Sequence, residues 1–359
     1  AIAVARKLGV RLIELVDSAS APAGSFELAA LDSVPPTQCQ TGYVQTDDIA
    51  LILHTSGTTS RPKIVPLAQR NLCASAHNIR STLAFTTADR GLNVMPLFHI
   101  HGLMAGLLAP LAAGSSVFCT PGFNALKFFA WMSEAKPTWY TAVPTMHQAI
   151  LGRAGNNRDV IAANPLRFVR SSSSSLPTQV IRELEATFNA PLIESYGMTE
   201  ASHQMTSNPL PPRARIPGAV GVAAGPQVAI MDTAGNLLGA NQTGEVVIRG
   251  SNVTSGYENN PKANAEAFTN GWFRTGDQGA INAEGYLTLT GRLKEIINRG
   301  GEKVSPLEVD EVLMDHPAVA QVVTFAMPHD KLGEEVAAAV VLREGATLTE
   351  KELREFAAK

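Results

Sequence analysis

The sequence predicts an α/β fold: a large N-terminal domain of mainly parallel, helix-covered sheets plus a β-barrel-like subdomain, and a small α+β C-terminal domain. Between Asp48 and Tyr196, short apolar runs alternate with longer amphipathic ones, a pattern typical of βαβ units. After Pro209, short β-type runs follow one another with Asn-Gly, Thr-Gly and Glu-Gly turns, which indicates antiparallel or barrel-like structure. A third pattern begins near Gly291. We therefore expect three segments, 1–208, 209–291 and 292–359.

The individual elements follow from these runs. In the first segment the apolar runs predict strands at 49–54, 91–95, 116–119, 139–143, 168–170 and 192–195. The amphipathic runs between them predict helices near 71–83, 101–112, 125–135, 145–151 and 178–188. The second segment predicts strands at 228–231, 245–249 and 286–290. The third predicts a strand at 295–298, a helix at 306–315, strands at 320–326 and 336–341, and a helix from 347. Because 1–15 reads as the end of a helix and a strand, and the last helix lacks a cap, we expect a chain truncated at both ends.

Composition narrows the function classes. With 29 Lys and Arg against 32 Asp and Glu the net charge is −3, so the basic excess typical of nucleic-acid-binding surfaces is absent. The longest apolar stretch, Gly102–Ala113, is shorter than the ~20 residues of a membrane span. Three widely spaced cysteines form neither a disulfide framework nor a zinc pattern, which favours an intracellular location. A choice between cytoplasm and peroxisome would need a C-terminal signal that cannot be read here, and oligomeric state leaves no trace in the sequence.

The segment Leu53–Lys63 carries the clearest chemical signal. It follows a predicted strand and combines hydroxyl side chains, one glycine and two cations, Arg61 and Lys63. A phosphate group needs many short donors on a flexible backbone together with cations that offset its charge. The segment is not a Walker loop, because GxxxxGK[ST] is absent. Its residue types therefore indicate a phosphate-binding loop, with an ordinary Ser/Thr-rich turn as the alternative.

Thr55–Lys63 resembles the phosphate-binding loop of the acyl-adenylate-forming superfamily, which includes acyl-CoA synthetases. Four further stretches resemble motifs of this superfamily in the expected order: Tyr196–Glu200, Gly244–Gly250, Thr275–Asp277 and Gly291–Glu295, the last followed by Gly300–Lys303. The resemblance implies a two-step reaction, in which ATP and a carboxylate give an acyl-AMP that a thiol of coenzyme A then attacks. The expected co-substrates and cofactors are ATP, coenzyme A and Mg²⁺.

The resemblance also implies roles for particular residues. Those expected to bind ATP or AMP are Thr55, Ser56, Gly57, Thr58, Thr59, Tyr196, Gly197, Thr199, Asp277 and Arg292. Those expected to act in catalysis are Lys63, Thr199, Glu200 and His99, with Glu200 holding Mg²⁺ that bridges the ATP phosphates. Coenzyme A is expected at Gly300, Gly301 and Glu302, and the hinge of the C-terminal domain at Lys294.

Polar residues near the expected acid pocket are unusual for a fatty-acyl enzyme. His99, the serine run Ser171–Ser175 and His203 could hold the unreacted carboxylate of a small dicarboxylic acid, since burying it unpaired is costly. We expect His99, Ser173 and His203 to bind the substrate, with histidine able to be charged beside an anion. These stretches are most similar to the oxalate–CoA ligases of the superfamily, which implies oxalate as the acid.

Alternatives remain open at this point. His99 could only gate a tunnel, and the serine run could be a turn. The chain could belong to a ligase for short-chain fatty acids or 4-coumarate-type acids. It could also be a nucleotide-binding fragment with little turnover, because the C-terminal lysine motif of the superfamily has no match before Lys359.

Overall fold

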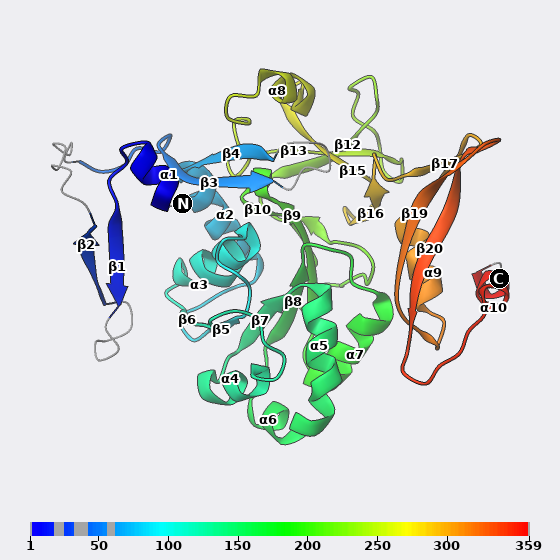
Figure 1. Cartoon of the computed structure of the whole chain (residues 1–359), viewed down its shortest axis with the longest axis horizontal. Coiled ribbons are helices and arrows are strands. Elements are labelled where there is room, and N and C mark those ends of the chain that lie inside the picture. Colours follow the sequence, from blue (N-terminus) through cyan, green and yellow to red (C-terminus); the bar gives the residue numbers. More distant parts are fainter. Residues whose placement is uncertain (1, 18–24, 32–41, 56–61, 358–359) are drawn as a thin grey trace. The chain divides into compact units, whose positions relative to one another are not determined.

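The computed structural model describes residues 2–17, 25–31, 42–55 and 62–357 and divides into two compact units, 1–44 and 45–359 (Figure 1). The first unit contains helix α1 (Ile2–Lys7) and the antiparallel strands β1 (Ile13–Asp17) and β2 (Phe26–Ala30). The predicted boundaries after 208 and 291 fall inside the second unit and stay predictions.

A seven-stranded sheet forms the centre of the second unit, and its strand order is β11-β10-β9-β8-β7-β5-β6. Its members are β5 (Arg90–Asn93), β6 (Ser116–Cys119), β7 (Trp139–Ala142), β8 (Phe168–Ser172), β9 (Leu192–Met198), β10 (His203–Ser207) and β11 (Val222–Ala223). Strands β5, β6, β7, β8 and β9 run parallel to their neighbours. Strand β10 pairs antiparallel with β9 and with β11. The predicted α/β class is confirmed.

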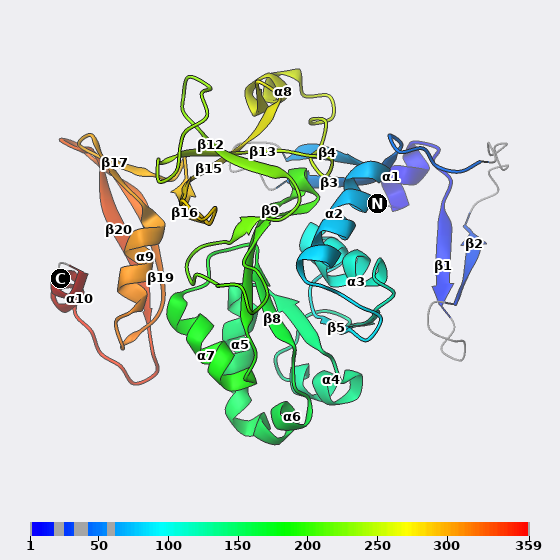
Figure 2. The ribbon, with the colours of Figure 1, turned by 180° about the vertical axis from the view of Figure 1, so that it is seen from behind.

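Helices cover both faces of this sheet, as Figures 1 and 2 show from opposite sides. Neighbouring strand residues alternate between two apolar clusters: Trp139 and Phe168 belong to one, Tyr140 and Val169 to the other. This alternation follows from the two-residue period of a strand. The helices of the sheet region are α2 (Gln69–Thr82), α3 (Ala109–Leu111), α4 (Phe128–Ala135), α5 (Pro144–Ala154), α6 (Arg158–Ala163) and α7 (Thr178–Phe188), with a 3₁₀ turn η2 at Gly155–Asn157.

One predicted helix has a different form. Instead of an α-helix over 101–112, the chain forms a π-helix η1 (His101–Leu108) that continues into α3. Gly102 and Gly106 explain the close packing here: an added Cβ would lie 2.4 Å from the carbonyl oxygen of Pro96 and 2.6 Å from Oδ1 of Asn93, respectively. π-Helical turns are rare and frequent at functional sites.

Two further sheets adjoin the α/β region. Strands β3 (Ile49–Thr55) and β4 (Lys63–Ala68) form an antiparallel pair. A second, antiparallel sheet beside α8 (Pro261–Ala267) consists of β12 (Gln227–Met231), β13 (Gly244–Arg249), β14 (Phe268–Thr269), β15 (Trp272–Ile281) and β16 (Leu287–Arg292). Val65, Met205, Val246 and Phe273 lie in one apolar cluster. The β-rich region therefore shares a core with the central sheet.

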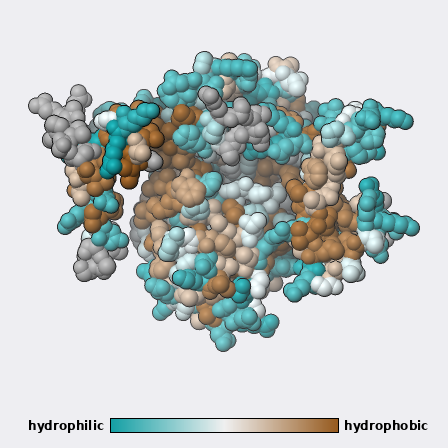
Figure 3. All heavy atoms as spheres, in the orientation of Figure 1, coloured by the Kyte–Doolittle hydropathy of each residue, from teal (hydrophilic) through white to brown (hydrophobic). Residues whose placement is uncertain are grey.

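The last segment forms a four-stranded sheet with two helices. Its elements are β17 (Ile297–Arg299), β18 (Glu302–Val304), α9 (Pro306–Met314), β19 (Val319–His329), β20 (Gly333–Leu342) and α10 (Glu350–Ala357). Ser305 caps α9 by accepting a hydrogen bond from the Glu308 amide at 3.2 Å. Exposed Val323, Phe325 and Met327 contribute to an apolar surface over β19 and β20, at the right of Figure 3. Within the described ranges, no helix is both long and apolar enough to span a membrane.

Candidate active site

The arms of the predicted phosphate-binding loop form the hairpin β3–β4. Thr55 ends β3 and pairs with Lys63, the first residue of β4. The predicted ligands Ser56, Gly57, Thr58 and Thr59 lie outside the described residues. Nζ of Lys63 lies 4.4 Å from the ring centroid of Tyr257, a cation–π contact that fixes the direction of the ammonium group.

Glu200, which is predicted to hold Mg²⁺, is buried. It lies in the 3₁₀ turn η3 (Thr199–Ala201), is 5% exposed, and accepts a hydrogen bond from the Tyr257 hydroxyl at 2.8 Å. Tyr257 thus contacts both Lys63 and Glu200. Burial and the neighbouring Glu200 raise the pKa of the Tyr257 phenol, so it stays a donor. In the described part of the chain, no group of three His, Cys, Asp or Glu is arranged to hold a metal ion.

The residues predicted to bind the nucleoside come together from three strands. The Tyr196 hydroxyl of β9 donates a short hydrogen bond to Asp277 of β15, and Nε of Arg292 lies 3.2 Å from Oδ1 of Asp277. Burial raises the pKa of Asp277, while Tyr196 and Arg292 oppose that shift. Burial and Asp277 also raise the pKa of Tyr196. Gly197 pairs with Gln204, and a Cβ on it would lie 1.8 Å from the His203 carbonyl oxygen, so a side chain there would require β10 to move.

Glu245, in the Gly-Glu strand β13, holds the turn that carries Asp277. Its Oε1 accepts the Gly276 amide at 2.9 Å, and its Oε2 accepts Nε of Arg274 at 2.8 Å. Gly276 has φ +76°, a conformation that glycine adopts without cost. The Gly-Glu and Thr-Gly-Asp motifs, about 30 residues apart in the sequence, therefore form one structural unit.

A polar cluster lies at the carboxyl ends of β7 and β8, where parallel sheets usually bind ligands. Its central residue is Arg170 of β8, which is fully buried. Nη1 of Arg170 lies 3.3 Å from Nε2 of His101, and Nη2 lies 3.0 Å from Nε2 of His203. The two imidazoles stack with centroids 4.9 Å apart and an interplanar angle of 13°.

Hydroxyl and amide groups complete this cluster, which we call the acid-pocket cluster: Thr141, Arg170, Ser173, His101, His203 and Gln204. Thr141 Oγ1 lies 2.7 Å from Nε2 of His101, and Ser173 Oγ lies 3.0 Å from its Nδ1. Burial first, and then Arg170, lower the pKa of His101 and of His203. Both imidazoles are therefore neutral in this structure, where Arg170 is the charged member of the cluster. The prediction that a histidine is charged beside an anion stays a prediction.

Three residues at this cluster have left-handed backbones. The φ angles are +79° at Ser173, +49° at Ser202 and +93° at His203. Non-glycine residues are uncommon in this region and concentrate at functional sites. The backbone geometry around His203 is thus set by its surroundings and not by its own preference.

The remaining predicted residues lie in exposed turns. His99 is exposed beside Phe98, with ring centroids 5.4 Å apart, and His101 takes the buried position instead. Gly300 and Gly301, with φ +61° and +101°, join β17 to β18 next to Glu302, and Lys294 follows β16 in a turn. The roles predicted for these residues stay predictions.

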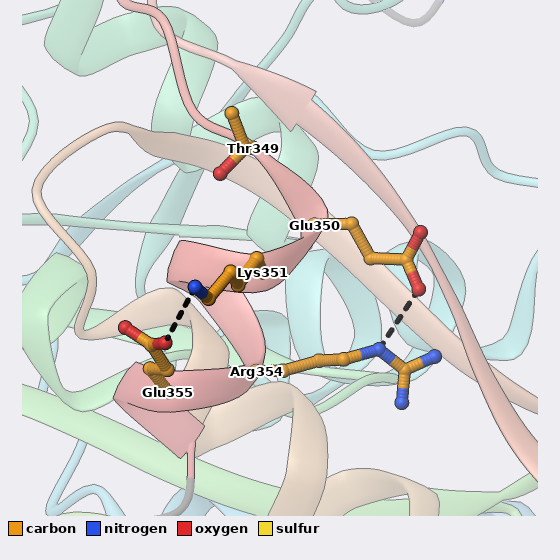
Figure 4. A pocket seen from close by; sticks show the side chains of 5 residues that line it. All are labelled: Thr349, Glu350, Lys351, Arg354 and Glu355. Carbon is orange, nitrogen blue, oxygen red and sulfur yellow. Dashed lines mark hydrogen bonds and ion pairs between the residues drawn. The ribbon is translucent and has the colours of Figure 1, made fainter.

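Sequence reasoning missed Arg170, Thr141, His101 and Tyr257 as members of the site. Arg170 stands directly before the serine run, and a charged residue inside an otherwise apolar predicted strand was the available signal. By contrast, a surface hollow on α10 is lined only by exposed side chains such as Arg354 and Glu355 (Figure 4). Its charges pair along the helix, Arg354 with Glu350 at 2.8 Å and Lys351 with Glu355 at 3.8 Å, as on any solvated helix.

Comparison with known proteins adds an independent finding. A model described as AMP-binding enzyme matches residues 3–258, and one described as AMP-binding enzyme C-terminal domain matches residues 308–359. The chain is 51% identical to an oxalate–CoA ligase of Arabidopsis thaliana over 87% of this chain and 61% of that protein. It is 48% identical to an oxalate–CoA ligase of Saccharomyces cerevisiae over 89% of this chain and 58% of that protein. The crystal structure of ATP-bound MatB from Rhodopseudomonas palustris superposes with a TM-score of 0.82 at 32% identity, covering 87% of this chain and 62% of that one. The chain thus spans less than two thirds of the length of each of these relatives.

Proposed function

The chain belongs to the AMP-binding enzyme family, and on that premise we propose that it is part of an ATP-dependent acid–thiol ligase acting on oxalate. In the first step a carboxylate oxygen of oxalate attacks the α-phosphorus of ATP, giving oxalyl-AMP and pyrophosphate. In the second step the thiolate of coenzyme A attacks the oxalyl carbonyl carbon and AMP leaves. The chain has a buried site rich in polar groups that can bind an anion.

The first step requires stabilisation of negative charge on the transferring phosphoryl group. Lys63 lies at the end of the loop segment, and its ammonium is positioned by the Tyr257 ring. Thr199 and Glu200 follow β9 in η3, where Thr199 would donate to a phosphate oxygen and Glu200 would hold Mg²⁺. Mg²⁺ would supply further neutralisation of phosphate charge.

The nucleoside would lie against the cluster Tyr196, Asp277 and Arg292. The Asp277 carboxylate would accept hydrogen bonds from the ribose hydroxyls, as Tyr196 and Arg292 already hold it in place. Gly197 allows β9 to lie close to β10, because a Cβ at this position would collide with the His203 carbonyl oxygen. Thr55 and the loop residues Ser56, Gly57, Thr58 and Thr59 would bind the phosphates.

The observation that carries the choice of acid is the buried polar cluster around Arg170. Pockets for fatty or aromatic acids are lined mainly by apolar side chains, and such a tail would leave this cluster unpaired. Oxalate would bring its second carboxylate to the donors Ser173 and His203. The exposed His99 would contact the acid from the solvent side of the pocket. In the second step the pantetheine arm would approach past Gly300, Gly301 and Glu302, with Lys294 as the hinge.

A substrate panel tests this proposal. Pyrophosphate release by the full-length protein is measured with oxalate, malonate, hexanoate and 4-coumarate in the presence of ATP, Mg²⁺ and coenzyme A. We expect kcat/KM for oxalate to exceed that for each other acid by at least tenfold. Equal rates for oxalate and hexanoate would show that the acid is misassigned.

The variant His203→Ala separates binding of the acid from binding of ATP. Removing the imidazole deletes a hydrogen-bond donor to the acid and also a partner of Arg170. We therefore expect KM for oxalate to rise at least thirtyfold, about 2 kcal/mol, with KM for ATP unchanged. His77→Ala, on helix α2 and outside the acid-pocket cluster, is the matched control. Normal kcat/KM for oxalate in His203→Ala would remove His203 from the acid site.

A further inference from the structure

Arg170 is a buried cation without an anionic partner among the described residues. Its side chain is 0% exposed, and its hydrogen-bond partners are His101, His203, Thr141 and Gln204, all uncharged. No carboxylate of a described residue forms an ion pair with it. Burial lowers the pKa of Arg170 to about 9, which leaves the guanidinium protonated at pH 7. Buried charges in proteins are normally paired, so an unpaired one indicates that an anionic ligand completes the site.

Arg170 also determines which nitrogens of the two histidines carry hydrogen. A guanidinium only donates, so Nε2 of His101 and Nε2 of His203 both accept. An imidazole that accepts at Nε2 is neutral and carries its hydrogen on Nδ1. Nδ1–H of His101 then donates to Ser173 Oγ at 3.0 Å, while Nδ1 of His203 makes no hydrogen bond to the described residues and is left as a donor.

We propose that Arg170 is the positioning residue that makes this site select a dicarboxylic acid. Its guanidinium fixes His101 and His203 as neutral Nδ1–H donors and supplies, from behind them, the positive charge that the second carboxylate meets. This inference rests on the proposed function and deepens it. The N–H groups on Nη1 and Nη2 of Arg170 are directed at protein partners, and its buried Nε–H has no partner among the described residues. In this proposal Arg170 acts through the two imidazoles that its Nη atoms hold.

Charge then explains the selection. A diacid keeps one carboxylate after the other has reacted with ATP, and the negative charge of that carboxylate balances the positive charge of Arg170. A monocarboxylic acid leaves Arg170 uncompensated and excludes the water that would otherwise solvate the cluster. Discrimination against apolar acids therefore arises from an unpaired buried charge as well as from pocket shape.

The kinetic test uses two variants. Arg170→Met keeps the side-chain volume and removes the charge, and Arg170→Lys keeps the charge and loses the two Nη groups that hold both histidines. Arg182→Met is the matched control, because Arg182 is an exposed arginine on α7. In Arg170→Met we expect KM for oxalate to rise about thirtyfold or more with KM for ATP within twofold, and in Arg170→Lys an intermediate rise. A KM for oxalate within threefold of wild type, or equal rises for oxalate and ATP, would overturn the proposal.

Histidine-selective ¹⁵N NMR of the free wild-type protein tests the mechanism without turnover. We expect Nδ1–H resonances for His101 and His203, assigned with the His101→Gln and His203→Gln variants; an Nε2–H tautomer at either ring would overturn the proposal. The charged or titratable groups facing these rings are Arg170 on β8, His147 on α5 and His99. In Arg170→Met the pKa of both rings should rise, because the repulsion from the guanidinium is gone.

These measurements separate the two hypotheses. Wild-type protein that releases pyrophosphate with another acid and not with oxalate would refute the proposed function, while the NMR tautomers would still decide the role of Arg170. Wild-type activity on oxalate with an unaffected Arg170→Met would refute only the role of Arg170. If Arg170→Met does not fold, Arg170→Lys and the wild-type spectra still give both outcomes.

Discussion

Tyr257 links the lysine of the phosphate-binding segment to the carboxylate expected to hold Mg²⁺, and the substitution Tyr257→Phe isolates one of its two contacts. The change deletes the hydroxyl that donates to Glu200 at 2.8 Å and keeps the ring beneath Lys63. Tyr257 and Glu200 are at most 6% exposed, so water does not replace the lost donor. A hydrogen bond to a buried carboxylate contributes about 1.5–3 kcal/mol, and we expect the free energy of unfolding to fall by that amount.

The assay is equilibrium urea unfolding followed by circular dichroism, with Glu200→Gln and the double variant completing a double-mutant cycle. Tyr286→Phe is the matched control, because the Tyr286 hydroxyl donates to a neutral acceptor, the Ala214 carbonyl, at 2.6 Å. Its loss should cost only about 0.5–1.5 kcal/mol. A coupling energy between Tyr257 and Glu200 below about 0.5 kcal/mol would refute the reasoning.

Two further predictions concern the buried carboxyl groups of Glu194 and Glu245. Burial raises the pKa of Glu194 to about 8, so the folded state binds a proton that the unfolded state releases near pH 4.5. Stability should therefore fall between about pH 4.5 and 8, by at most about 1.4 kcal/mol per pH unit, and thermal unfolding of Glu194→Gln should lack this slope; an identical slope would contradict the assignment. Glu245→Ala removes the acceptor of Gly276 and Arg274, so we expect a loss of about 3–5 kcal/mol and a rise in KM for ATP that exceeds the rise for oxalate. Equal KM values for ATP in variant and wild type would show that support of the Asp277 turn by Glu245 does not affect nucleotide binding.

Much of the fold could be predicted because the central strands are apolar runs buried on both faces. Trp139–Ala142 and Leu192–Met198 both begin within predicted strands. Strands β10 and β15 were missed, since His203–Ser207 and Trp272–Ile281 are polar or glycine-rich and gain their strand conformation from neighbouring strands. β4 was also missed, because Pro66 lowers strand propensity and is tolerated only at a sheet edge.

The motifs did not predict the environments of the residues that they assigned to the site, and those assignments stay predictions. Tyr196, Asp277 and Arg292 were each assigned to the nucleotide, and the structure brings them into contact. Burial of Glu200 depends on Tyr257, 57 residues further along the chain. Burial of Arg170 depends on partners from three other elements. Such environments are properties of tertiary packing, and no local pattern of residues encodes them.

The left-handed backbones at Ser173, Ser202 and His203 have a consequence for engineering. Each such residue costs of order 1 kcal/mol, so glycine at Ser202 is the kind of change that a search for thermostability would select. That same change would loosen the peptide that orients the His203 ring. If the proposed function holds, a more heat-resistant chain obtained in this way will distinguish acids less sharply, so a stability screen needs acid selectivity as a second readout.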